Sequence, residues 1–242
     1  SDLSGETGAV ALNPWAEVGA GGYTLTIKPS GAPRVISGVS SGSGLIVLNG
    51  ADRVTIDGSL GGGTDRSLTL SNTSATAAVV WIRSASAVDG STFDTVKNCV
   101  ITGGSGTTTV AGVVAGSGVT LGDPAEAPNS NNTLRNNVIT TVQSALYLLG
   151  NSTEPDQNWL VTGNTFGSTD AADKLGVRGL LIGNAQAFTG LRFNLEHLAR
   201  EGLVGKGRHR DHGRQPGRDL ADVGLVDQRT HQSACQVVDH EP

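Results

Sequence analysis

A near-constant repeat constrains the fold of this chain more than any other feature. Five short apolar segments look alike, and their starts are separated by 34, 34, 33 and 34 residues. Each follows small residues and ends in a polar or glycine turn. They are residues 45–49 (LIVLN), 79–83 (VVWIR), 113–117 (VVAGS), 146–150 (LYLLG) and 180–184 (LLIGN). A fixed period of this length is typical of a repeat protein in which each unit stacks on the next.

The repeated units consist of strands rather than helices. Short β-branched runs with alternating polarity lie between the five segments, at residues 54–58, 68–72, 96–101, 134–139 and 161–166, as in strands. The chain has 35 glycines among 242 residues, and glycine destabilises a helix interior by about 1 kcal/mol, so a helical solenoid is excluded. We therefore predict an all-β, right-handed parallel β-helix of about five coils, with a β-propeller as the second choice.

Stacking places equivalent residues of successive coils above one another. Asparagines at one turn position then bond to their copies, and we expect two such ladders: Asn98 with Asn136 or Asn137 and Asn164, and Asn49 with Asn151 and Asn184. The rows that point into the interior are predicted to hold Leu45, Val47, Val79, Trp81, Val113, Leu146, Leu148, Leu180 and Ile182.

Three strand–turn units resemble those of a known superfamily: residues 50–58 (GADRVTIDG), 95–101 (TVKNCVI) and 134–139 (LRNNVI). They are similar to units of secreted bacterial right-handed parallel β-helix proteins of the pectate-lyase-like superfamily. The resemblance covers residues 20–190, roughly. It implies a β-helix located outside the cell or on its surface, often within a longer exported chain. It is specific for the fold and says little about activity.

The composition changes abruptly after residue 190. All five histidines and 16 of the 39 charged residues lie in the last 52 residues, where serine, threonine and asparagine become rare. We predict a β-helix domain over residues 1–190, with residues 1–20 as an N-terminal cap. Residues 191–242 form an atypical charged tail, either translated out of frame, disordered or partly helical at residues 191–199. The missing methionine and signal peptide suggest a fragment of a longer protein.

Paired carboxylates are the first place to look for catalysis. The resemblance implies that an enzyme of this kind is a polysaccharide lyase or glycoside hydrolase with an acidic groove on one face. The candidate catalytic residues are Asp52, Asp57, Asp65, Arg53 and Arg66. Ca²⁺ is the one cofactor that this interpretation leaves open, because acids on consecutive coils together with turn carbonyls supply oxygen ligands. The alternative role for each aspartate is to cap a turn.

Other classes of site have weaker support in the sequence. Trp159, which opens a strand after a polar loop, and Tyr147 are the candidates for stacking on a sugar ring. No metal site is predicted: His209 and His212 lie between glycines and arginines that do not preorganise ligands. The net charge of −5, with no basic stripe, argues against nucleic acid, and no apolar run is long enough to insert into a membrane.

These observations predict a non-catalytic extracellular β-helix module for surface adhesion or glycan contact. The competing prediction is the carbohydrate-active enzyme described above. A third, ice or mineral binding, requires one outward plane containing Thr24, Thr26, Thr55, Thr69 and the threonines of residues 107–109. Neither the ligand nor the oligomeric state follows from the sequence.

Overall fold

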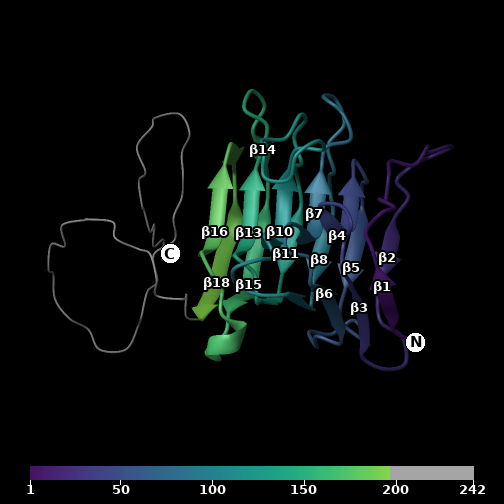
Figure 1. Ribbon diagram of the computed structural model, residues 1–242. Coiled ribbons are helices and arrows are strands. Elements are labelled where there is room, and N and C mark those ends of the chain that lie inside the picture. The colour runs from purple at the N-terminus through teal and green to yellow at the C-terminus, as the bar shows by residue number, and fades with distance from the viewer. Residues whose placement is uncertain (197–242) are drawn as a thin grey trace, which may run out of the picture.

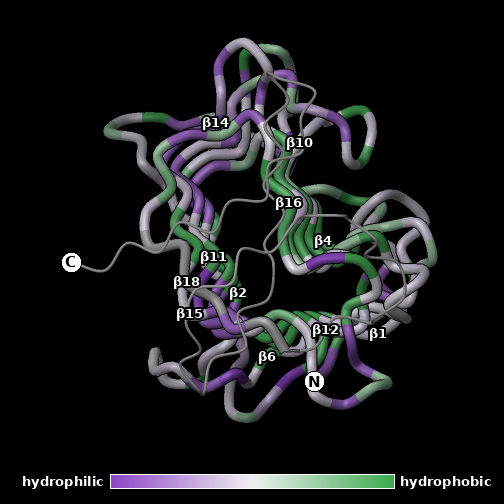
Figure 2. Tube along the Cα trace, turned by 90° about the vertical axis from the view of Figure 1, so that its left-hand side faces the viewer, coloured by the Kyte–Doolittle hydropathy of each residue, from purple (hydrophilic) through white to green (hydrophobic). Residues whose placement is uncertain are grey.

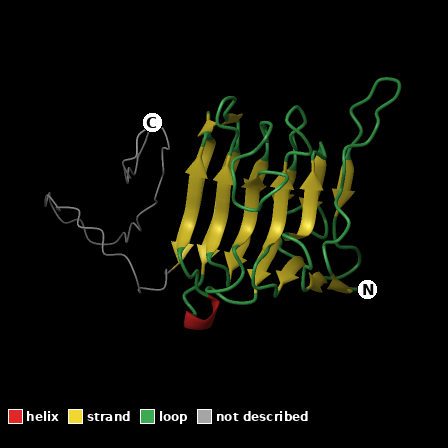
Figure 3. Ribbon diagram, turned by 45° about the horizontal axis from the view of Figure 1, so that its top comes forward, coloured by secondary structure: helices red, strands yellow, loops and turns green. Residues whose placement is uncertain are grey.

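The computed structural model describes residues 1–196, which wind into a parallel β-solenoid of about six turns. Each full turn passes through three strand positions, so that the strands of successive turns lie side by side along the axis (Figure 1). The predicted fold class is confirmed, with slightly more turns than the five expected. Among the described residues, strands make up almost all of the regular structure, and the one short helical turn is η1 (Ala171–Asp173), red in Figure 3.

The strands form three faces. Face 1 contains β2 (Leu25–Ile27), β5 (Val54–Asp57), β8 (Thr95–Lys97), β11 (Thr133–Arg135) and the start of β15 (Leu160–Gly167). Face 2 contains β1 (Leu3–Glu6), β3 (Arg34–Gly38), β6 (Leu68–Asn72), β9 (Cys99–Gly103), β12 (Val138–Thr140) and the end of β15. Face 3 contains β4 (Gly44–Asn49), β7 (Ala78–Arg83), β10 (Ala111–Gly116), β13 (Ser144–Leu149) and β16 (Arg178–Gly183). A two-stranded sheet joins β14 (Asp156–Gln157) to β17 (Ala185–Gln186).

The hydrophobic core fills the space that the three faces enclose. Figure 2, a view along the axis, shows hydrophobic residues on the strands of faces 2 and 3. Alternate residues of each strand point inward, as β geometry requires. In face 1 the inward residues of three successive turns are Ile56, Val96 and Leu134, all at most 1% exposed.

Face 3 corrects part of the predicted interior. Ile46 pairs with Val80, and the equivalent residue of the next turn is Val113. Val47 and Trp81 pair with each other and belong to a second apolar cluster, separate from the main core. A shift of one residue exchanges the two faces of a strand, so the prediction placed these two side chains on the wrong side of the sheet.

The N-terminal segment covers one edge of face 3. Leu12 forms a parallel bridge with Leu48; its N–H donates to Val47 O and its carbonyl accepts from Asn49 N–H. Trp15 packs against the main core. An open strand edge invites pairing with other chains, and the bridge at Leu12 occupies the edge of β4 at Leu48.

At the other end, residues 191–196 differ from the prediction. They belong to the strand β18 (Thr189–Glu196), which pairs in parallel with β15, and not to a short helix. Pairing with β15 satisfies backbone groups that an isolated helical turn of this length leaves free. The strand therefore runs across residue 190, where the composition changes. The remaining predictions for the tail, including His209 and His212, fall outside the described residues. No helix in the described part of the chain is long and apolar enough to cross a membrane.

Candidate functional site

The candidate carboxylates lie at opposite ends of the face 1 strand β5. Asp57 is the last residue of β5, whereas Asp52 lies two residues before the strand begins. The two therefore lie in the same coil but at the two different loops that flank β5. Asp65 and Arg66 lie in the loop between β5 and β6, on the Asp57 side.

Asp57 is held by four groups. Its Oδ1 accepts hydrogen bonds from Asn98 Nδ2 (2.8 Å), Ser59 N (3.0 Å) and Ser59 Oγ (2.9 Å), and Lys97 Nζ lies 3.1 Å from Oδ2. Burial alone raises the pKa of this carboxyl, but these hydrogen bonds, of which the one from Asn98 has the largest effect, lower it to about 2. Asp57 is therefore a fixed carboxylate that holds its turn.

Asp65 and Arg66 stabilise the loop that follows β5. Asp65 accepts from Leu60 N (3.0 Å) and from Ser67 Oγ (2.7 Å). Arg66 donates through Nε to Asn136 O (2.8 Å) and through Nη2 to Asn136 Oδ1 (2.6 Å). Asp65 therefore closes the loop on itself, and Arg66 holds the loop against the turn after β11, two coils further along.

At the other end of β5, Asp52 and Arg53 also bind within the structure. Asp52 accepts from the backbone N–H of Thr92 at 2.9 Å. Arg53 forms an ion pair of 2.9 Å with Glu17, and its guanidinium lies 6.0 Å from the centre of the Phe93 ring. The five candidate residues are thus split between the loops at the two ends of β5. Asp57 and Asp65 bond within their own turns, as turn-capping aspartates do, whereas Asp52, Arg53 and Arg66 bond to other segments.

The two aromatic candidates are less accessible than expected. Trp159 is fully buried and donates from its indole N–H to Asn129 O at 2.7 Å. The expectation that Trp159 is exposed is therefore wrong, because this position lies inside the coil and not at its surface. Tyr147 is half-buried, packs against the second apolar cluster and donates to Gly122 O at 3.2 Å.

Two regular columns of side chains lie on the outward surface of face 1. The first consists of Thr26, Thr55, Thr95 and Thr133, which stand in register on β2, β5, β8 and β11. The second consists of Asp57, Lys97, Arg135 and Thr162. Of the first column, Thr26 and Thr55 were predicted to share a plane, but the complete columns could not be predicted because the register between coils was unknown.

The predicted asparagine ladders occur in a different arrangement. Asn136 donates to Asn98 Oδ1 (2.7 Å) on the outside of the turn, and Asn137 donates to Asn164 Oδ1 (3.0 Å) on the inside. Both alternatives for this turn are therefore occupied, each in its own ladder.

The second predicted ladder, at Asn49, Asn151 and Asn184, does not form. Asn49 bonds to Asn13, Asn151 to Ala125 O and Glu126 O, and Asn184 to Gly150 O. Asn49 is the last residue of β4 and pairs with Arg83, whereas Asn184 lies one residue beyond the end of β16 and Asn151 two beyond the end of β13, so these asparagines do not stack.

Two buried carboxyl groups occur beside the ladders, at Asp94 and Asp156. Burial raises the pKa of Asp94 to about 8, an effect to which Asp52 adds and which the Val54 N–H opposes. Burial likewise raises the pKa of Asp156 to about 7. The burial of these two carboxyls could not be predicted from the sequence, because only the folded coil removes them from water.

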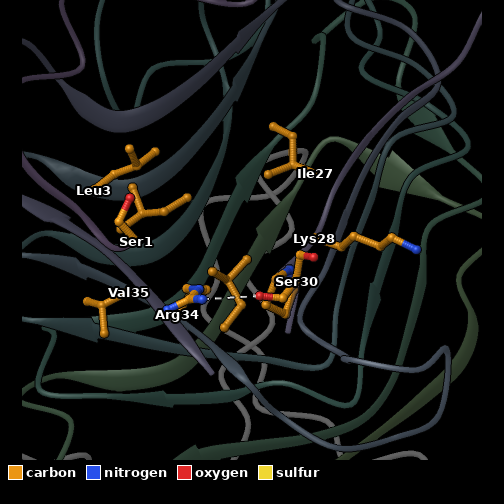
Figure 4. A pocket seen from close by; sticks show the side chains of 10 residues that line it. Ser1, Leu3, Ile27, Lys28, Ser30, Arg34 and Val35 are labelled. Atoms are coloured by element: carbon orange, nitrogen blue, oxygen red, sulfur yellow. Dashed lines mark hydrogen bonds between the residues drawn. The ribbon is translucent and has the colours of Figure 1, made fainter. Parts of the chain in front are cut away.

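A cavity of about 440 Å³ opens at the N-terminal end, between the first strands of faces 1 and 2. Its apolar lining includes Leu3, Ile27 and Ile36. Figure 4 shows Arg34 bonded to Ser30 O, at 3.3 Å, while the Lys28 amine points away from the other lining residues. The cavity is the end of the interior and contains none of the candidate catalytic residues.

The described residues include no group of three or more histidine, cysteine, aspartate or glutamate side chains that could hold a metal ion. Comparison with known proteins adds no assignment: no protein-family model, no curated protein and no solved structure matches the chain.

Proposed function

We propose that this chain is a non-catalytic β-solenoid module that contacts glycans through the outward surface of face 1. The supporting observation is the pair of in-register columns, one of threonines and one that includes Lys97 and Arg135. Neighbouring strands of a sheet are roughly 4.8 Å apart, so the threonine hydroxyls recur at a constant interval along the axis, and Lys97 and Arg135 stand on two adjacent strands beside them. A linear polysaccharide likewise repeats its hydroxyls and acidic groups along its length.

The chemistry of the carboxylates favours binding over bond cleavage. A general acid works best when its pKa lies near the working pH, and the pKa of Asp57 is lowered to about 2. The pKa of Asp94 is raised to about 8, but this residue is only 1% exposed, which closes it to a polysaccharide. The other acids near β5, Asp52, Asp57 and Asp65, accept hydrogen bonds from neighbouring backbone N–H groups.

The proposal includes a setting. The resemblance of the strand–turn units to those of exported pectate-lyase-like solenoids supports an extracellular or cell-surface location, with adhesion as the biological outcome. It also supports a place within a longer exported chain.

Two matched double variants test the binding surface. Thr95→Val with Thr133→Val removes two hydroxyls from face 1, whereas Thr102→Val with Thr140→Val removes two from paired positions of face 2. Binding to a panel of neutral and acidic polysaccharides is measured by surface plasmon resonance. We expect the face 1 variant to lose roughly tenfold in affinity, from two hydrogen bonds of about 0.5–1.5 kcal/mol each. The face 2 variant retains the wild-type affinity.

Failure of the wild-type chain to bind any polysaccharide, or equal weakening of both variants, contradicts the proposal. The same panel is assayed for new reducing ends and for unsaturated uronides. Either product replaces the proposal with the alternative, a glycoside hydrolase or a polysaccharide lyase.

A further inference from the structure

The turn that leads into face 1 carries a hydrogen-bond relay between coils. Asn132 precedes β11, and its Oδ1 accepts from the N–H of Asp94 at 2.8 Å. Asp94 precedes β8, and its Oδ1 accepts from the N–H of Val54, also at 2.8 Å. Because Thr133 and Thr95, the next residues, are paired in register, Asn132 and Asp94 occupy equivalent positions in successive coils.

The second polar atom of each side chain distinguishes the two positions. Asn132 Nδ2 donates to the carbonyls of Ser91 (2.9 Å) and Asn129 (3.2 Å). In Asp94 the corresponding atom is Oδ2, which is buried and has no hydrogen-bond partner. An ionised carboxylate at this position can accept a hydrogen bond but cannot donate one as the amide NH2 group of asparagine does. A protonated carboxyl group regains a donor through its O–H.

The same substitution occurs in a neighbouring column. Asp156 Oδ1 accepts from the N–H of Asn129 at 2.9 Å, just as Asn129 Oδ1 accepts from the N–H of Ser91 at 2.9 Å. Asn129 Nδ2 donates to Gly116 O at 3.0 Å. Asp156 Oδ2, like Asp94 Oδ2, is buried without a partner.

The surroundings of both carboxyls disfavour a negative charge. The charged group that acts on Asp94 is another acid, Asp52, and the remaining influence is the Val54 N–H. Asp156 is acted on by the N–H groups of Asn129 and Asn151 and by the Trp159 indole, all uncharged. None of these neighbours, all within the described chain, is a cation, and a buried charge without a counter-ion is costly.

We propose that Asp94 and Asp156 are uncharged carboxylic acids in the folded chain and form pH-sensitive links between neighbouring coils. In acidic solution each link has the donor and the acceptor of an asparagine, and the coils hold together. In alkaline solution each link becomes a buried anion, and the coils separate more easily.

The sign of the pH effect follows from proton linkage. Burial raises the pKa of both carboxyls above the value of an aspartate in an unfolded chain, which is about 3.9. The folded chain therefore holds protons that the unfolded chain has already released. Stability is highest below the unfolded value and falls as the pH rises through about 7 and 8.

The test replaces the acids with the amide that the ladder already uses. The variants are Asp94→Asn, Asp156→Asn and the double variant. Asp123→Asn, at an exposed position, is the matched control. Urea unfolding is measured at roughly pH 5 and roughly pH 9, on either side of the raised pKa values. We expect the midpoint of the wild type and of the control to decrease between the two conditions, and that of the double variant to change much less.

An infrared measurement reports on protonation directly. At pH 6 the folded wild type should show the carbonyl band of a protonated carboxylic acid, weakened in each single variant and lost in the double variant. Absence of this band from the wild type at pH 6 overturns the proposal. So does a double variant that keeps the full pH dependence of the wild type.

Discussion

Asn137 offers the sharpest test of what holds the coils together. Its side chain is fully buried at the turn between faces 1 and 2. Oδ1 accepts from the N–H of Cys99 (2.9 Å), and Nδ2 donates to Val96 O (2.9 Å) and to Asn164 Oδ1 (3.0 Å). One side chain thus joins its own coil to the coil before and to the coil after. We predict that Asn137→Ala strongly destabilises the solenoid.

The size of the effect follows from these three bonds. The buried Cys99 N–H loses its acceptor, which costs about 1–3 kcal/mol. The two bonds that Nδ2 donates contribute about 0.5–1.5 kcal/mol each. The free energy of unfolding should therefore fall by roughly 2–6 kcal/mol, a large part of the stability of an ordinary domain.

The measurement is urea unfolding followed by tryptophan fluorescence, which reports on the buried Trp81 and Trp159. Unfolding free energies come from linear extrapolation to water. The matched control is Asn13→Ala, because Asn13 is exposed and accepts one surface hydrogen bond, from Asn49. We expect this control to lie within about 0.5 kcal/mol of the wild type.

A second variant, Asn137→Asp, separates the acceptor from the donor. It keeps an oxygen for the Cys99 N–H and exchanges the NH2 group for an oxygen, as occurs naturally at Asp94. It should therefore be close to the wild type in acid and destabilised in alkaline solution. If Asn137→Ala costs less than about 1 kcal/mol, or no more than Asn13→Ala, the ladder does not hold the coils together.

Three further predictions concern single positions. A Cβ on Gly58 would lie 1.8 Å from Asn98 O, whereas nothing lies within 4 Å of a Cβ on Gly61. Gly58→Ala should therefore lower the melting temperature by several degrees and Gly61→Ala should not; equal melting temperatures would contradict the close approach. Cys99 is fully buried and its pKa is raised to about 12, so in a Cys235→Ser background a thiol reagent should label it only on unfolding; rapid labelling of the folded chain would place the thiol at the surface. The pKa of Asp57 is lowered to about 2, so its contribution is complete above about pH 4 and is lost towards pH 2; Asp57→Asn should flatten this acid limb of the stability curve by about 1 kcal/mol after solvent screening, and an unchanged limb would rule the carboxylate out as its source.

The repeat period was sufficient to predict the architecture. Equal spacing of apolar segments requires equal units, and units rich in glycine, threonine and valine stack as strands. The residues that point inward were harder to predict. Leu45 and Val79 were correctly placed in the core, whereas Val47 and Trp81 face the other side of β4 and β7. The spacing of the apolar segments places Val79 opposite Val113, whereas the strands pair Val80 with Val113. This shift of one residue puts Val47 and Trp81 on the other side of the sheet, and the spacing of 33 or 34 residues does not reveal it.

The candidate site was predictable only in its residue types. The sequence identified Asp52, Asp57 and Asp65 as notable acids, and the structure assigns them to turns at two ends of β5. Trp159 was expected at the surface because it follows a polar loop, but it points into the core and bonds to Asn129. The position and burial of these side chains depend on which residues the neighbouring coils place next to them. A short stretch of sequence does not show this.

By itself the sequence determined that this chain is an all-β parallel solenoid, because its period and composition leave few other ways to bury its apolar residues. Only the tertiary structure decided the register between coils. That register aligns the threonine column of face 1, divides Asn136 and Asn137 between two ladders, and places Asp94 and Asp156 where asparagine amides otherwise stand. The physical reason is that stacking removes these side chains from water, so that a difference of one atom, oxygen or nitrogen, acquires a large energetic consequence.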